Sequence, residues 1–251
     1  MRGRRLLMGL WRSFLIAYLT NLIPFKRQPI WALNYLITPF TIIFFAYVYV
    51  GSIIMPYALI GGLISITVAS TIVVETDIAH MRVLLRLQDV FVASPSGPLP
   101  YYFGIALGNL IITVPALVMI LFLISQVVPV TVFNLLVIGG CVILLWITIS
   151  VWGFIIGSRA KELKDLWTYS PMITALLTVL PPVFYPHELL PPQIAQLAFL
   201  TPTYVCARII QMSFSLSEIG EVELLYIIAG LLGFVVVEGL LARRYVKWED
   251  L

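Results

Sequence analysis

Charged residues are scarce in this chain, which is 61% hydrophobic and 11% charged and has a mean hydropathy of +1.04. So low a charge content excludes an ordinary soluble globular protein. The 251 residues match about six membrane crossings, because each crossing takes roughly 20 apolar residues plus a connection. The composition therefore predicts an all-α polytopic membrane protein with a single transmembrane domain over residues 1–251 and no separate soluble domain.

Residues suited to metal or nucleotide chemistry are equally few. Cys141 and Cys206 lie in different apolar segments without metal-type spacing, which indicates packing residues. The histidines are His80 and His187, and the predicted topology puts them on opposite membrane faces. The phosphate-cradling loop G-x-x-x-x-G-K-[ST] is absent, so the chain should not hydrolyse ATP itself. We expect no catalytic residue, no metal ligand and no cofactor on this chain, although an intramembrane enzyme or a stand-alone channel remains a rival class.

Uncharged runs mark the predicted spans. Residues 28–74 carry no charge and are divided by "VGSIIMP" at 50–56, which predicts a helical hairpin. Residues 90–158 are again uncharged and are divided by "SQVVPVT" at 125–131. Two further apolar segments follow. The six predicted spans are about 30–51, 56–75, 100–126, 131–158, 166–182 and 224–242.

The basic residues orient these spans, since short cytoplasmic loops are enriched in Lys and Arg. With the N-terminus inside and six spans, every basic residue except Arg208 falls on the cytoplasmic side. Five or seven spans would destroy this partition. Both termini are therefore predicted to be cytoplasmic, in the cell membrane of a prokaryote.

The segment 76–98 joins spans two and three on the cytoplasmic side. Arg82, Arg86 and Asp89 are spaced by four and three residues and would share one face of a helix. A short amphipathic helix of this kind rests on a membrane surface or docks on a partner. The "SPSGP" sequence at 94–98 would end it. The spacing alone is also compatible with a loop that merely reconnects two spans.

The outer segment 183–223 contains two apolar pieces, 193–200 and 203–214, each preceded by a proline. Neither is long enough to cross the bilayer, so we expect an extracellular re-entrant helical hairpin between spans five and six. His187 and Glu188 lie in this segment as surface polar groups or as an extracellular gate.

A few polar residues lie within the predicted spans. Glu238 is in span six, where it either reaches the inner interface or forms a proton or substrate site, and Glu75 at the inner end of span two would be a gate or loop anchor. Residues that could face a substrate path are Asn34, Thr38, Ser65, Thr67, Tyr169, Ser170 and Thr174. For each of these alone, helix packing is the more common role.

The order of three segments resembles the membrane-spanning subunit of ATP-binding cassette (ABC) exporters of the type-2 permease class. They are "KRQPIWALNYLITPFTIIFFAYVYVG" at 26–51, "ETDIAHMRVLLRLQDVFVASPSGPLPYYFGIALGN" at 75–109 and "PPVFYPHELLPPQIAQLAFLTPTYVCARIIQ" at 181–211. With the six-span pattern they cover nearly the whole chain. The Gly-Thr pair usual after the coupling-loop glutamate is missing here.

The resemblance implies a mechanism. The 76–98 loop would carry a coupling helix that contacts a cytoplasmic ABC ATPase subunit through Arg82, Arg86, Leu87 and Asp89. Residues 4–21 would form an amphipathic helix among the lipid head groups. A second permease copy would complete the substrate path, with ATP and Mg on the partner ATPase. The expected cargo is an amphiphilic small molecule or lipid, the alternative is a polysaccharide or glycolipid, and no nucleic-acid partner is expected.

Overall fold

All regular secondary structure in the described part of the chain is helical. The computed structural model describes residues 11, 15–16, 18–27, 31–85, 98–189, 191, 197–217 and 220–245. The longer helices are α3 (Trp31–Val50), α4 (Met55–Ile72), α7 (Pro98–Val127), α8 (Val132–Arg159), α9 (Leu163–Thr178), α11 (Pro202–Ser213) and α12 (Glu221–Tyr245). The shorter elements are η1 (Tyr18–Leu22), α2 (Ile23–Arg27), η2 (Ser52–Ile54), α5 (Val74–Ala79), η3 (His80–Leu84) and η4 (His187–Leu189).

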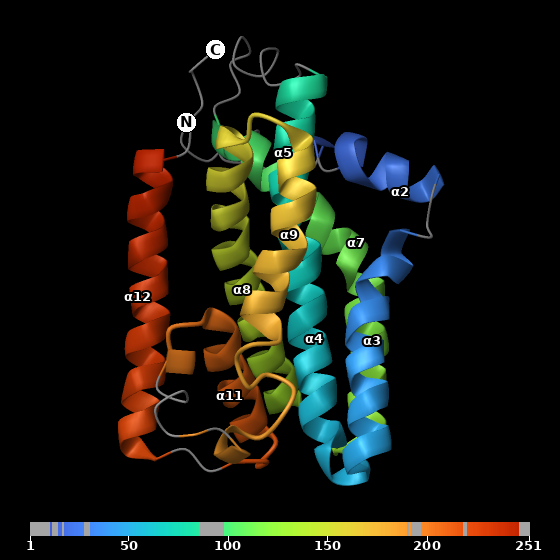
Figure 1. The fold of residues 1–251 in the computed structure, drawn as a ribbon, viewed down its shortest axis with the longest axis vertical. Coiled ribbons are helices and arrows are strands. Elements are labelled where there is room, and N and C mark those ends of the chain that lie inside the picture. The colour runs from blue at the N-terminus through green and yellow to red at the C-terminus, as the bar shows by residue number, and fades with distance from the viewer. Residues whose placement is uncertain are drawn as a thin grey trace.

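The long helices form one bundle. In Figure 1, α3, α4, α7, α8, α9 and α12 run along the long axis, and α11 lies at the end where α3 joins α4. α5 continues α4 toward the opposite end, near which both termini are drawn. This up-and-down arrangement follows the sequence prediction, since each predicted span overlaps one of these helices.

Helical structure extends beyond the second predicted span. That span was expected to end at residue 75, and helix continues through α5 and the π-helical turn η3 to Leu84. Val74, Ile78 and Met81 are buried at a helical spacing, so the apolar face extends past the charged residues that suggested a boundary. The first part of the expected 76–98 loop is therefore helix, and residues 86–97 lie outside the described part of the chain.

Three helical stretches are long and apolar enough to cross a membrane: Ser52–Leu84, Pro100–Val127 and Val132–Arg159. Pro39–Val50 and Leu225–Leu241 are apolar but shorter. The all-helical fold and these stretches support a membrane protein. The number of six crossings stays a prediction.

α4 is the central helix of the bundle. It packs against α3, α7, α8, α9 and α11, and most of its residues are buried on every side. Ile60, Ile64 and Ile66 contribute to a core shared with α7 and α8. A helix that is apolar all round is suited to such a position, because it has no face that prefers water.

α5 and α8 approach closely because α8 has glycines where they meet. A Cβ added to Gly157 would overlap the backbone carbonyl oxygen of Glu75. At Gly153 an added Cβ would lie 3.3 Å from the backbone nitrogen of Glu75 and from Cβ of Val74. Small residues four apart let two helix backbones approach within membranes. This contact fixes the position of α5 on α8.

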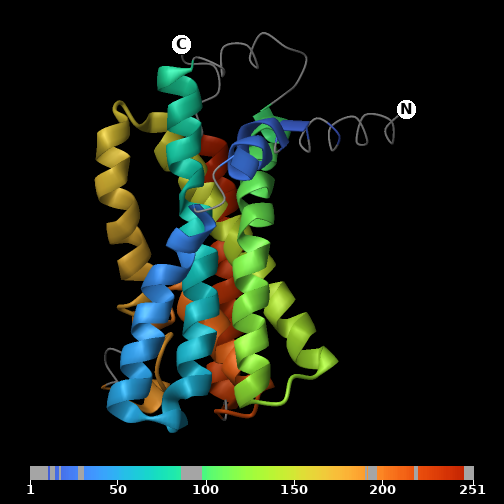
Figure 2. The ribbon, with the colours of Figure 1, turned by 90° about the vertical axis from the view of Figure 1, so that its right-hand side faces the viewer.

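The segment Tyr18–Arg27 lies across the bundle axis rather than along it (Figure 2). The side-chain amide of Asn21 donates to the carbonyl oxygen of Ile105 at 3.1 Å, and Gly108 leaves space for Asn21 against α7. Helix extends here to Arg27, beyond the expected end at residue 21. Most of the predicted interfacial helix at 4–21 lies outside the described residues, so its interfacial character stays a prediction.

The outer segment is helical in part. The second predicted piece is present as α11, which begins at Pro202, whereas residues 193–196 of the first piece lie outside the described part. Cys141 of α8 and Cys206 of α11 are buried, and each sulfur lies 3.9 Å from the other residue's carbonyl oxygen. They are packing residues between the two helices, as the sequence predicted. The re-entrant character of the hairpin stays a prediction.

The contact at Gly157 predicts that alanine at this position destabilises the protein more than alanine at Gly139 of the same helix. Gly157→Ala should lower the free energy of unfolding by about 1–3 kcal/mol, because the new methyl group meets backbone that cannot move aside. Gly139→Ala in the same helix is the control, since an added Cβ meets nothing within 4 Å there. Thermal unfolding in detergent would measure both. Equal stability of the two variants would contradict the close α5–α8 contact.

Candidate functional site

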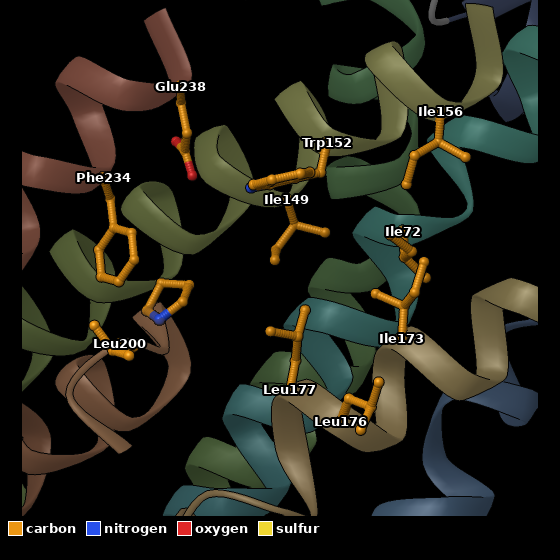
Figure 3. A pocket seen from close by; sticks show the side chains of 11 residues that line it. Ile72, Ile149, Trp152, Ile156, Ile173, Leu176, Leu177, Leu200, Phe234 and Glu238 are labelled. Atoms are coloured by element: carbon orange, nitrogen blue, oxygen red, sulfur yellow. The ribbon is translucent and has the colours of Figure 1, made fainter. Parts of the chain in front are cut away.

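A cavity of about 380 Å³ lies among the ends and faces of α4, α8, α9, α11 and α12. Figure 3 shows its side chains projecting from several helices toward a common space. The lining is Ile72, Ile149, Trp152, Ile156, Ile173, Leu176, Leu177, Leu200, Pro202, Phe234 and Glu238. Glu238 is the charged residue among them, and the others are apolar or aromatic.

Helical spacing explains how the cavity forms. Ile149, Trp152 and Ile156 follow one another at intervals of three and four on α8, and Phe234 and Glu238 are four apart on α12. Each helix therefore contributes one face. Trp152 and Leu176 are 43% and 47% exposed, so the cavity is open on one side.

The Glu238 carboxyl group is the polar feature of the cavity. Its side chain is only 4% exposed, and Thr148 and Trp152 of α8 lie within hydrogen-bonding reach. Its Oε1 atom has no hydrogen-bond partner among the described residues. The side chain thus faces the cavity and α8, and the choice between an interface residue and a proton or substrate site stays a prediction. A carboxyl group at such a place is costly unless a partner compensates it.

Glu75 is a second buried carboxyl group, and it joins three helices. It belongs to α5 and is fully buried, and the Ser170 hydroxyl of α9 donates to its Oε1 atom and lies 2.8 Å from the Leu166 carbonyl oxygen. Its backbone contacts Gly157 of α8. Its Oε2 atom has no partner among the described residues. The predicted anchor residue thus lies where α5, α8 and α9 meet.

Arg82 binds the C-terminal end of α8. Its guanidinium group donates to the carbonyl oxygens of Ala160 and, at 3.4 Å, of Gly157. A cation at the C-terminus of a helix satisfies free carbonyl groups and complements the helix dipole. The other predicted coupling residues, Arg86, Leu87 and Asp89, lie outside the described residues.

Among the predicted substrate-path residues whose side chains the structure describes, none lines the cavity. Ser65 and Thr67 are buried within α4, and the Thr67 hydroxyl donates to the Leu63 carbonyl oxygen at 2.9 Å. Tyr169 is exposed on α9, and Thr174 is partly buried and accepts from the Thr178 hydroxyl through its carbonyl oxygen. The side chains of Asn34 and Thr38 lie outside the described part. Hydroxyl-to-backbone bonds of this kind are the packing role noted above.

The predicted extracellular gate residues belong to a polar cluster around α11. Arg208 is 1% exposed, and its guanidinium pairs with Glu223 of α12 at 2.7 Å and with Glu188 at 3.8 Å. The Tyr204 hydroxyl lies 2.7 Å from Nδ1 of His187. The cluster connects η4, α11 and the first turn of α12.

Sequence reasoning missed several partners. Trp152 and Phe234 line the cavity, but nothing in the sequence distinguishes them from other apolar residues of their helices. The Asn109 amide donates to Asp77 at 2.7 Å and so joins α7 to α5, which the sequence did not predict. The pairing of Arg208 could have been expected from the sequence, because a lone cation in an apolar outer segment needs a carboxylate partner. Among the described residues, no three of His, Cys, Asp and Glu form a metal-binding group. No family model matches the chain, and a search of curated proteins finds no match.

The buried ion pair of Arg208 should contribute far more to the free energy of unfolding than an exposed ion pair does. We expect Arg208→Met to lower the free energy of unfolding by about 3 kcal/mol or more, because it leaves Glu223 without its cation. Lys164→Met is the control, since its pair with Glu162 is 73% and 58% exposed and should contribute about 1 kcal/mol or less. Thermal unfolding in detergent would compare the variants. A similar loss in both would contradict a structural role for the cluster.

Proposed function

We propose that this chain is the membrane-spanning subunit of an ABC exporter. Two copies would form the translocation unit, with six spans each and both termini in the cytoplasm of a prokaryotic cell. The observation that carries the proposal is the apolar cavity of about 380 Å³ among five helices of a chain with membrane-spanning character. The order of sequence segments that resembles type-2 permeases supplies the class.

The cavity favours an amphiphilic small molecule or lipid as the cargo. Its volume is at the lower end of the range of small-molecule sites, which is roughly 300–1,000 Å³. A glycan would need many hydrogen-bonding groups, whereas the lining offers the Glu238 carboxyl group and otherwise apolar or aromatic side chains. Burial of hydrocarbon against this lining would supply the binding free energy.

The helical extension α5–η3 suits the transmission of force from an ATPase. It continues the central helix α4, contains the proposed coupling residue Arg82 and ends just before the other three. Arg82 and Glu75 tie the extension to α8, and Ser170 ties it to α9. A displacement at residues 86–98 would therefore act on helices that line the cavity.

The energy source would be a separate cytoplasmic subunit. The chain has no G-x-x-x-x-G-K-[ST] loop, so ATP and Mg would bind to the partner ATPase. At the other end of the bundle, the cluster of Arg208, Glu223 and Glu188 would hold the outer side closed until ATP binding rearranges it. Access to the cavity would then alternate between the two sides.

ATP hydrolysis by the reconstituted complex tests the proposal most directly. We expect amphiphilic drugs or lipids to stimulate the ATPase activity of permease plus ATPase in proteoliposomes, and glycans to leave it unchanged. Stimulation by glycans alone would overturn the assigned cargo. A complex that contains no nucleotide-binding partner would overturn the ABC assignment.

Charge reversal tests the coupling segment. Arg82→Glu combined with Arg86→Glu should prevent co-purification of the ATPase subunit, because both cations lie in or beside the proposed contact. Arg82 also holds the end of α8, so Arg86→Glu alone and a thermal-unfolding measurement separate lost docking from lost folding. Lys161→Glu is the control, as an exposed cation after α8. Full retention of the ATPase by a folded double variant would contradict the assignment.

A further inference from the structure

The cavity carries a charge of one sign. Its lining contains the Glu238 carboxyl group, two aromatic rings and eight aliphatic or proline side chains, and among the described lining residues there is no Lys or Arg. We propose that this cavity binds a hydrophobic cation, with Glu238 as the counter-ion. As a statement about cargo this deepens the proposed function and rests on it, whereas the binding itself requires only this chain.

Hydrogen-bond donors beside Glu238 stabilise its ionised form, and they act against the burial of the carboxyl group, which favours the neutral form. The indole nitrogen of Trp152 is a hydrogen-bond donor and cannot accept, and in Figure 3 it is directed toward the Glu238 side of the cavity. The Thr148 hydroxyl supplies a second donor. Donors of this kind stabilise an anion more than a neutral carboxyl group. The Oε1 atom is left for a ligand, since it has no partner among the described residues.

The cost of burying this anion is what a cationic ligand would relieve. Glu238 is 4% exposed and lies in an apolar part of α12. An unpaired charge in such surroundings is unfavourable, and an opposite charge nearby offsets the loss of hydration. A bound cation would therefore gain additional affinity from the Glu238 carboxylate. A neutral or anionic molecule of the same shape would gain none of it.

The rest of the lining suits the apolar part of such a ligand. Trp152 and Phe234 place aromatic rings beside the carboxylate, and the faces of aromatic rings attract cations. Ile149, Ile173 and Leu177 provide aliphatic surface on the opposite sides (Figure 3). Carboxylate, aromatic rings and hydrocarbon together distinguish organic cations from small inorganic ones, which would leave the apolar surface uncovered.

The open side offers a route of entry. Trp152, Leu176 and Leu200 are 43%, 47% and 72% exposed, and all three line the cavity. Apolar side chains with this exposure on membrane helices face lipid. A cationic amphiphile dissolved in the bilayer would therefore reach Glu238 sideways, without passing through water.

Two ions of the same shape and opposite charge test the proposal. Tetraphenylphosphonium and tetraphenylborate would be titrated against the purified full-length chain in nanodiscs, with empty nanodiscs as the reference. We expect saturable binding of tetraphenylphosphonium and at least about tenfold weaker binding of tetraphenylborate. Equal binding of both ions, or no saturable binding of the cation, would overturn the proposal.

Substitution of Glu238 tests whether the cation binds at this residue. Glu238→Gln should weaken tetraphenylphosphonium binding by about tenfold or more, and Glu238→Asp should retain much of it, because aspartate keeps the charge. Glu162→Gln is the matched control, since Glu162 lies outside the cavity and is 58% exposed. Unchanged binding by a Glu238→Gln variant that unfolds at the wild-type temperature would overturn the assignment. If that variant does not fold, the comparison of the two ions on the wild-type chain still decides.

The outcome is separable from that of the proposed function. The binding measurement uses neither ATP nor an ATPase subunit. Failure of tetraphenylphosphonium to bind would leave an ABC exporter of neutral lipids or drugs intact. Absence of an ATPase partner would leave a membrane protein with a cation site.

Discussion

The close approach of α5 to α8 is the contact on which the arrangement of the other helices depends. Gly157 brings the backbone of Glu75 against α8, and this approach lets Arg82 reach the carbonyl groups at the end of α8. It also sets the Glu75 side chain beside Ser170 of α9. The hydrocarbon core of a bilayer offers no water as a hydrogen-bond partner, so polar groups such as these are stabilised by partners within the fold. Loss of space at one glycine would disturb all of them together.

Polar residues at the two ends of the bundle have different tasks. Near α5, hydrogen bonds from Arg82 and Ser170 join helices whose relative position would change if a cytoplasmic partner moved them. Around α11, the buried Arg208 is paired with carboxylates of α12 and of η4. Breaking such a pair is costly, because it leaves a buried charge without compensation. Between the two ends lies an apolar cavity with one carboxyl group, which gives a ligand something to bind once either end opens.

The surroundings of Glu238 distinguish it from a carboxylate at the membrane surface. A carboxylate at the membrane interface would be hydrated, but here it lies against Thr148 and Trp152 and is almost fully buried. The same side chain thus changes from a solvated end group into a counter-ion. Its hydrogen-bond donors and the neighbouring aromatic rings act in the same direction, because both make the cavity more attractive to positive charge. This agreement between separate side chains supports a built site.

The sequence by itself determined the helical class, the approximate ends of the long helices and the packing role of the cysteines, because these depend on local hydropathy and on breaks in it. It did not show how far helix continues past the second predicted span, since the buried face formed by Val74, Ile78 and Met81 continues beneath charged neighbours. The sequence suggested mainly hydroxyl residues for the substrate path. In the structure, the hydroxyl groups of Thr67 and Ser170 donate to backbone carbonyl oxygens of their own helices. Only the tertiary structure brought Glu238, Trp152 and Phe234 together, because they come from α8 and α12, and α12 begins more than sixty residues after α8 ends. Spacing along one helix predicts its faces, whereas the partner of a face is decided by packing between helices.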